Sequence, residues 1–174
     1  AFSRASVVES YPTTLNELLG VSGWANDMDN ALSFQCPSGQ SINAIVSYHH
    51  NHYEDRRWKF ACKATAGITD NCSWSGYANN WDEVMSFSCA GQSVIAGWSS
   101  DHHNHYEDRR MKFRCCQLQT GAVLTNCALS GNANSLDGWL KYGVPANKLL
   151  YGVTSWHSNH HEDRVFRFQT CSKV

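Results

Sequence analysis

Alternating apolar and polar positions run through most of this chain. In residues 56–62, Trp58 and Phe60 alternate with polar or small residues, and the same parity recurs in residues 109–115 and 164–170. Successive side chains of a β-strand point to opposite faces of a sheet. The alternation therefore predicts three strands that each turn one apolar face toward a core.

Two further sets of β-prone runs precede these strands. One set is Leu32–Cys36, Met85–Cys89 and Leu140–Val144, and the other is Ser41–Tyr48, Val94–Ser100 and Leu149–Trp156. No run has the length and 3.6-residue period of a convincing helix, so the chain is predicted to be all-β. Residues 13–19 are expected to form a terminal strand or one helical turn.

The runs recur because the chain contains three copies of one unit. The sequence YHHNHYEDRRWKFAC at 48–62 returns as DHHNHYEDRRMKFRC at 101–115 and, more diverged, as WHSNHHEDRVFRFQT at 156–170. An upstream motif, G-x-A-N-x-x-D, begins at Gly23, Gly76 and Gly131. The repeats therefore span about 23–63, 76–116 and 131–171.

A unit of this size cannot bury its own sheet, so the three repeats are expected to share one core. We predict that residues 1–174 form a single all-β domain with pseudo-threefold symmetry. Its architecture would be either a β-prism of three sheets or a trefoil-like barrel.

Eight cysteines, an even number in a short chain, predict four disulfides and an oxidising compartment. The pairs that treat the repeats alike are Cys36–Cys62, Cys89–Cys115, Cys72–Cys116 and Cys127–Cys171. Exchanging Cys115 and Cys116 gives the main rival scheme. Val144 and Thr170 occupy the positions of the pair within a repeat in the third copy, which therefore lacks that disulfide.

Composition removes several classes of protein. Charged residues make up 17% of the chain and the formal net charge is −1, which argues against disorder and against a strong field toward nucleic acid or membrane. No run approaches the ~20 apolar residues of a membrane-spanning helix. The first residues lack a basic segment followed by an apolar run, so they are interpreted as the mature N-terminus of a secreted protein.

Three features of the sequence resemble a known family: FQCPSGQ at 34–40, the adjacent pair Cys115-Cys116, and the segments DRRWKFAC, DRRMKFRCC and DRVFRFQTC. They are similar to motifs of the dermatopontin family of extracellular matrix proteins and invertebrate lectins, over nearly all of residues 23–174. The resemblance implies a secreted, disulfide-bonded β protein. Vertebrate members are associated with collagen, proteoglycan and cell adhesion, and invertebrate members with agglutination or biomineral matrix.

All nine histidines lie in three equivalent segments that the family motif does not define. Amides and carboxylates in these segments can form paired hydrogen bonds with sugar hydroxyls, and aromatic rings can stack on the apolar face of a sugar. The predicted glycan-binding residues are His49, Asn51, His52, Tyr53, Glu54, His102, Asn104, His105, Tyr106, Glu107, His157, Asn159, His160, His161 and Glu162.

An Asp-Arg pair follows each segment. Arg56 has the parity of the inward residues, and a buried arginine needs a carboxylate from its own or a neighbouring repeat. We expect structural ion pairs here, with direct sugar contact as the alternative. The residues concerned are Asp55, Arg56, Asp108, Arg109, Asp163 and Arg164.

Other interpretations of the segments compete with glycan binding. His50, His52 and Glu54 alternate onto one face as zinc ligands do, but Ser158 interrupts the pattern in the third repeat, and no metal or cofactor is assigned. Catalysis is not expected, because the adjacent Glu54 and Asp55 point to opposite faces and no hydrolase or metalloprotease motif occurs. The remaining interpretation is a solvated loop multiplied by duplication.

The sequence therefore predicts a secreted, multivalent, agglutinating lectin with one glycan site per repeat and no enzymatic activity. Its expected partners are glycans on cell surfaces or matrix, acidic ones included, with no nucleic acid and no membrane insertion; homo-oligomerisation is left open. The first alternative is an extracellular matrix or biomineral adhesion protein that binds collagen or sulfated proteoglycan. The second is a His-rich metal-binding protein.

Overall fold

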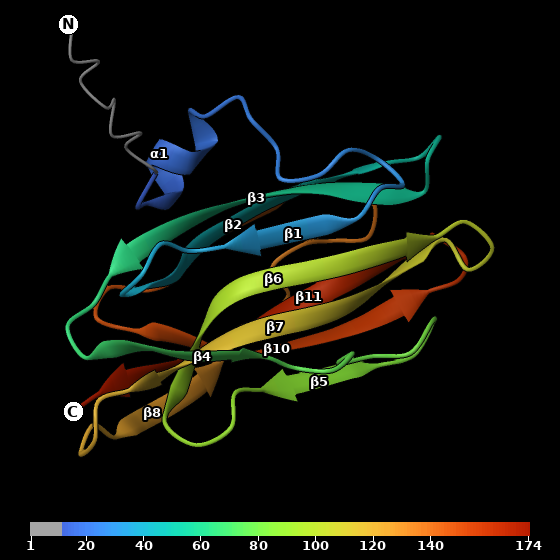
Figure 1. Cartoon of the computed structure of the whole chain (residues 1–174). Coiled ribbons are helices and arrows are strands. Elements are labelled where there is room, and N and C mark those ends of the chain that lie inside the picture. Colours follow the sequence, from blue (N-terminus) through green and yellow to red (C-terminus); the bar gives the residue numbers. More distant parts are fainter. Residues whose placement is uncertain (1–11) are drawn as a thin grey trace, which may run out of the picture.

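The alternating runs of the repeats form the strands of three antiparallel sheets (Figure 1). The structure is a computed structural model and describes residues 12–174. All nine predicted strand segments are strands, which confirms the all-β prediction. The structure adds two strands that the sequence patterns did not predict, β4 and β8, both in the linkers between repeats.

The strands are distributed over the three sheets as follows. The first sheet, in the order β1-β6-β7-β4, contains β1 (Leu32–Gln35), β6 (Ser93–His103), β7 (Asp108–Leu118) and β4 (Ile68–Trp74). The second, β5-β10-β11-β8, contains β5 (Met85–Ser88), β10 (Leu149–Ser158), β11 (Asp163–Lys173) and β8 (Leu124–Leu129). The third, β3-β2-β9, contains β3 (Asp55–Ala64), β2 (Gln40–His50) and β9 (Leu140–Gly143).

Each repeat lends its first, short strand to the sheet of another repeat. Strand β1 of the first repeat pairs with β6 of the second, β5 of the second pairs with β10 of the third, and β9 of the third pairs with β2 of the first. The exchange closes a cycle of three, so no repeat can complete its sheet alone. This cyclic arrangement is compatible with a three-repeat prism.

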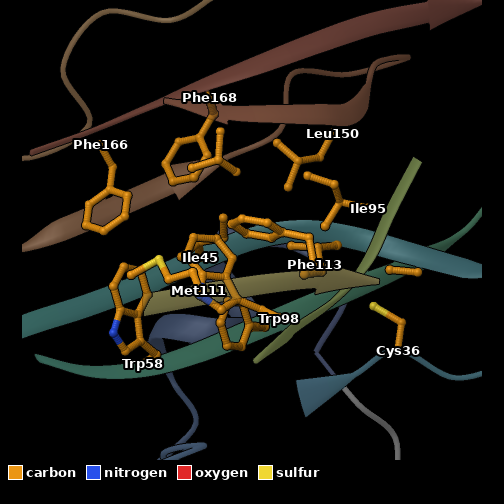
Figure 2. Packing of buried hydrophobic residues seen from close by; sticks show 14 of the residues in the cluster. Cys36, Ile45, Trp58, Ile95, Trp98, Met111, Phe113, Leu150, Phe166 and Phe168 are labelled. Carbon is orange, nitrogen blue, oxygen red and sulfur yellow. The ribbon is translucent and has the colours of Figure 1, made fainter. Parts of the chain in front are cut away.

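The inward faces of the sheets meet in one hydrophobic core. Trp58, Trp98, Phe113, Phe166 and Phe168 are fully buried in it. The Trp58 ring lies 5.0 Å from those of both Trp98 and Phe166, measured between centroids. Figure 2 shows these rings packed together from different sheets, so residues distant in the sequence share one interior. Aromatic burial on this scale is a major stabilising contribution.

A short helix, α1 (Leu15–Leu19), covers the outer face of the third sheet. It is the segment expected to be a strand or a helical turn. The Thr14 side chain caps it by accepting a hydrogen bond from the Glu17 N–H. Leu18 is 1% exposed and packs against Ala61, whose alternation had placed it on the outer face of its strand. In the described part of the chain, no helix is long and apolar enough to cross a membrane.

Four disulfides connect the strands: Cys36–Cys62, Cys72–Cys116, Cys89–Cys115 and Cys127–Cys171. These are the pairs that treat the repeats alike, and Cys115 and Cys116 are not exchanged. The first and third pairs join different sheets, because each connects the residue after a lent strand to a long strand of its own repeat. The other two join neighbouring strands of one sheet. All eight cysteines are paired, which fits an oxidising compartment.

Candidate functional site

The three histidine-rich segments form hairpin turns that lie at the same end of the molecule, on the right in Figure 1. The turns are residues 51–54, 104–107 and 159–162, which connect β2 to β3, β6 to β7, and β10 to β11. In the first two turns the N–H of the final glutamate donates to the carbonyl four residues earlier, at 2.8 Å. Because the three turns lie at one end of the molecule, side chains separated by about fifty residues in the sequence are brought close together in space.

The outer surface of each turn carries exposed imidazole and aromatic rings. In the first turn, the Tyr53 ring centroid lies 5.1 Å from that of His50 and 4.9 Å from that of His52. The second turn repeats this cluster, with 5.0 Å from Tyr106 to His103 and 4.9 Å from Tyr106 to His105. The third keeps one such contact, between the His160 and His161 rings at 4.9 Å. The three turns are thus alike in backbone, but the third has fewer clustered rings than the first two.

The second turn has a tryptophan stacked on its tyrosine. The Trp81 ring stacks on Tyr106 with centroids 5.6 Å apart and planes 6° apart. The Arg110 guanidinium lies over both Trp81, at 4.7 Å, and Tyr77, at 3.9 Å. The first and third repeats have Met28 and Leu136 at the position of Trp81. Trp81 is not among the predicted site residues, although its ring has no aromatic counterpart in the other two repeats.

One predicted histidine of each turn is buried. The side chains of His49, His102 and His157 are 1%, 1% and 0% exposed. His49 Nε2 lies 3.6 Å from a Glu54 carboxylate oxygen, and its Nδ1 lies 3.4 Å from an oxygen of Asp137, which belongs to the third repeat. The two equivalents make the same two contacts: His102 with Asp29 and Glu107, and His157 with Asp82 and Glu162. These rings connect neighbouring repeats and position the glutamates; they are not part of the exposed surface.

The Asp-Arg pairs form a closed ring of buried ion pairs between repeats. Each arginine Nε donates to an aspartate oxygen at 2.6 to 2.7 Å, and Nη2 donates to the second oxygen at 2.7 to 2.8 Å. The pairs are Arg56 with Asp163, Arg109 with Asp55, and Arg164 with Asp108. Two parallel hydrogen bonds per pair fix both the position and the orientation of the guanidinium relative to the carboxylate. These residues therefore hold the three repeats together beneath the turns.

The upstream motif G-x-A-N-x-x-D has a structural role that the sequence analysis missed. Asn26 is buried; its side chain donates to the Arg56 carbonyl at 3.0 Å and accepts from the Trp58 N–H at 2.8 Å. Asn79 and Asn134 make the equivalent bonds. The last residue of the motif, Asp29, is the carboxylate that faces His102. The motif occurs in all three repeats, and this recurrence is the signal from which its structural role could have been predicted.

The three turn glutamates surround one small cavity. Glu54, Glu107 and Glu162 line a cavity of about 20 Å³ whose other lining residues include Trp58, Met111 and Phe166 and the Asp-Arg pairs. Burial raises the pKa of each glutamate, and the histidine beside each one opposes this rise. Neighbouring carboxylates, Glu54 among them, raise the pKa of Glu107 and Glu162 further. The glutamates predicted for three separate sites thus share one axial position.

Within residues 12–174, three groups of side chains have the spacing of metal ligands. Each combines a buried histidine with two aspartates, as in His102, Asp29 and Asp55. In every group one aspartate is already bonded through both oxygens to an arginine, as Asp55 is to Arg109. The arginine supplies the positive charge that balances this carboxylate, so a cation placed there would lie close to a guanidinium and be repelled by it. The arrangement therefore fits hydrogen bonding between repeats better than metal coordination.

Comparison with known proteins supports the motifs quoted above. A family model described as dermatopontin matches residues 26–174. The chain is 46% identical over 150 residues to the hemagglutinin/amebocyte aggregation factor of Limulus polyphemus, covering 85% of this chain and 86% of the relative. It is 41% identical over 138 residues to dermatopontin of Biomphalaria glabrata, covering 79% and 92%. It is 38% identical over 158 residues to Millepora cytotoxin-1 of Millepora dichotoma, covering 91% and 70%.

No solved structure matches the chain significantly. The family model covers most of the sequence, and two of these relatives align with more than four-fifths of their own length. The matched region includes all three hairpin turns and all eight cysteines. The chain belongs to the dermatopontin family.

Proposed function

We propose that this protein is a secreted lectin that binds glycans through its three hairpin turns without catalysing a reaction on them. The observation that carries this proposal is the cluster of exposed rings that recurs, with almost the same geometry, at His50, His52 and Tyr53 and at their counterparts in the second turn. Tyr53 is 43% exposed and Tyr106 is 38% exposed, so neither ring belongs to the core. Exposed rings kept together in this way suit the apolar face of a sugar.

In the proposed site of each repeat, exposed residues contact the glycan and buried residues maintain the shape of the turn. Exposed Asn51, His52 and Tyr53, with their counterparts, offer hydrogen bonds and a stacking surface. The buried His49 and its counterparts hold the turn in shape. A shallow polar site of this kind binds weakly by itself, because water competes for every hydrogen bond. Three such sites on one chain raise the avidity for a glycan-covered surface.

Agglutination requires a further condition in this proposal. The three turns lie at one end, so a single chain presents all of them to the same surface. Cross-linking two cells then needs at least two chains joined away from the turns. The relative from Limulus polyphemus is named for hemagglutination and cell aggregation. We infer that agglutination by this protein requires a homo-oligomer, which light scattering in solution can measure.

The proposal assigns no catalytic role to the Glu-Asp pair at the end of each turn. The glutamate ends the turn and the aspartate begins the next strand, where it is buried and bonded through both oxygens to an arginine. It cannot serve as the second carboxylate of a glycosidase, which must face the scissile bond.

A second candidate is binding to sulfated polysaccharides of the matrix. Arg110 and Lys112 both lie over the Tyr77 ring beside the second turn, within 3.9 and 4.4 Å. This places two cations next to an aromatic surface, where a sulfate group could pair with them. Such binding would weaken steeply with salt, whereas recognition of neutral sugar hydroxyls would not.

A glycan array at two salt concentrations tests both candidates. We expect binding to persist at the higher salt and to be competed by a simple saccharide. Replacing His105 and Tyr106 by Ala should remove the contribution of the second turn and lower glycan binding at least several-fold. Val123→Ala serves as the control, because Val123 is exposed and lies beside the C-terminal Val174, with which it exchanges backbone hydrogen bonds. Binding that disappears at the higher salt would favour the polyanion candidate. An array without any bound glycan would refute the proposal.

A further inference from the structure

The axial cavity between the turns combines two kinds of hydrogen-bonding group. Glu54, Glu107 and Glu162 line it together with the three Asp-Arg ion pairs. Arg56 and Arg164 each keep one buried Nη1 group that has no acceptor among the described residues. The indole of Trp58 also lines it and is 0% exposed. Its Nε1–H has no hydrogen-bond acceptor among residues 12–174. A buried donor without an acceptor is costly, so this N–H indicates a group that the cavity receives.

The Trp58 donor occurs in one repeat only. Met111 and Phe166 occupy the equivalent positions, and neither has an N–H. Figure 2 shows Trp58 and Phe166 at the same end of the core cluster, with the indole nitrogen pointing away from Trp98. Trp98 is also buried with an unbonded Nε1, but it does not line the cavity. The cavity is therefore threefold in its carboxylates and arginines and asymmetric in its indole donor.

This combination selects one class of ligand group. A cavity of about 20 Å³ has room for a single water-sized atom. An ammonium group could donate to the carboxylates but could not accept from Trp58. A carboxylate or sulfate could accept from Trp58 and from the arginines, but it is larger than one water-sized atom. Each arginine is already paired with an aspartate, so the glutamates leave a net negative charge that repels an anion. A hydroxyl group both accepts and donates, and so satisfies both sides of the cavity.

We propose that the axial cavity binds one hydroxyl group of a glycan, which accepts a hydrogen bond from Trp58 Nε1–H and donates one to a turn glutamate. The sugar ring would then lie across the three turns, so that all three repeats contribute to one shared subsite. This inference rests on the proposed glycan-binding function. It adds a central subsite to the three exposed ones and makes Trp58 a determinant of specificity.

The geometry of the glutamates supports this assignment. All three adopt left-handed backbone angles, with φ of 49°, 48° and 49° for Glu54, Glu107 and Glu162. A non-glycine residue in this region costs about 1–2 kcal/mol, yet glutamate occurs there three times. Each carboxylate is also held by a buried histidine at 3.6 to 3.8 Å. Partial burial strengthens any hydrogen bond that these carboxylates accept.

Indole N–H resonances in a ¹⁵N-labelled sample provide a direct test. The chain contains seven tryptophans, and the signal missing from Trp58→Phe identifies that residue. The probes are the methyl glycosides of galactose, mannose and N-acetylglucosamine, together with the best ligand of the glycan array. We expect the Trp58 signal to shift on addition of at least one of them. The Trp98 signal should shift less.

The matched variants Trp58→Phe and Trp98→Phe separate loss of the N–H from loss of core packing. Each removes one unbonded indole N–H and keeps an aromatic ring in the core. We expect Trp58→Phe to weaken glycan binding about tenfold, the loss of one good hydrogen bond, and Trp98→Phe to leave it within about twofold. Circular dichroism and thermal unfolding check that both variants fold.

The outcomes distinguish this inference from the function on which it rests. If no glycan binds on the array, the proposed function fails and the axial subsite fails with it. If glycans bind and His105 and Tyr106 matter, but the Trp58 signal stays unchanged on saturation, the axial subsite is wrong and the cavity holds water only. Equal affinities of Trp58→Phe and Trp98→Phe would overturn it in the same way. If Trp58→Phe fails to fold, the Trp58 signal of the unmodified protein is assigned instead through its connection to the backbone resonances in a doubly labelled sample, and its shift decides the question.

Discussion

Single residues in the turns combine an unfavourable backbone with a useful side chain. Glycine adopts left-handed backbone angles without strain, and asparagine adopts them more readily than glutamate does. The final position of each turn is nevertheless glutamate, and the aspartates Asp29, Asp82 and Asp137, also left-handed, face the buried histidines. Strain maintained at equivalent positions usually marks a functional constraint. Glycine at these positions would relieve the strain but would remove the carboxylates that contact the buried histidines.

The glutamates should make stability depend on pH. Burial raises their pKa above the ordinary value of 4.5, so the folded protein holds these protons more tightly than the unfolded chain. Their contribution to stability therefore falls as pH rises from about 4.5 through the raised folded-state pKa. Changing Glu54, Glu107 and Glu162 together to Gln should remove this decrease and abolish glycan binding while the fold is retained. Urea unfolding between pH 4 and 8 measures the first effect.

The exposed Glu83 supplies the control for that experiment, because Glu83→Gln changes the net charge by one at a site outside the cavity. It should leave the pH dependence of unfolding close to that of the unmodified protein. A triple variant whose stability still falls over the same pH range would contradict the assignment. Retained glycan binding would remove the glutamates from the site.

At the scale of elements, the three long hairpins are equivalent in register but differ in what covers them. The linker strands β4 and β8 extend the sheets of the second and third repeats along one edge. Among the described residues before the first repeat, the Pro12 carbonyl accepts from the Cys62 N–H, and α1 packs on the outer face of the third sheet. The N-terminal segment thus completes the third sheet in a different way. Residues 1–11 lie outside the described part of the chain.

The helix should contribute to stability through one leucine. Leu18 is 1% exposed, and its neighbour Leu19 is 41% exposed in the same helix. Replacing Leu18 by Ala leaves a cavity against β2 and β3 and should cost about 2–5 kcal/mol of unfolding free energy. Leu19→Ala should change it by less than about 0.5 kcal/mol. Denaturant unfolding measures both values, and similar losses from the two variants would mean that α1 does not pack on the sheet.

At the scale of the whole molecule, the cycle of lent strands makes the three repeats depend on one another. Buried ion pairs and buried histidines cross every boundary between repeats. Disulfides reinforce two of the three connections between a lent strand and its own repeat, and the third has Val144 and Thr170 instead. The backbone there is nevertheless equivalent, because Val144 N–H donates to the Asn43 carbonyl as Cys36 N–H donates to that of Ala96.

Introducing the missing disulfide should therefore stabilise the molecule. We expect Val144→Cys combined with Thr170→Cys to form a fifth disulfide and to add about 2–4 kcal/mol, because the crosslink reduces the entropy of the unfolded chain. Non-reducing mass analysis detects the bond, and thermal unfolding before and after reduction measures its effect. The single variant Thr170→Ser is the control. Free thiols at both positions would show that the third repeat departs from the other two in geometry.

The sequence by itself determined the local features of this protein. Alternation predicted the strands, and the recurrence of HHNHYEDR placed the histidines and glutamates in equivalent turns, because period-two patterning and repetition are local properties. Equivalence of the cysteines also led to the disulfide pairs. The unpredicted strands β4 and β8 carry mostly exposed residues, so they lack the alternating apolar signal.

Only the tertiary structure decided which of these residues meet. The exchange of β1, β5 and β9 between repeats is a long-range pairing that no local pattern encodes. This exchange brings Asp29 beside His102 and Asp55 beside Arg109, and it gathers Glu54 and its two counterparts around one cavity. It also buries His49 while leaving His52 exposed three residues away. Burial depends on what packs against a side chain, and for His49 and Arg56 part of that packing comes from another repeat.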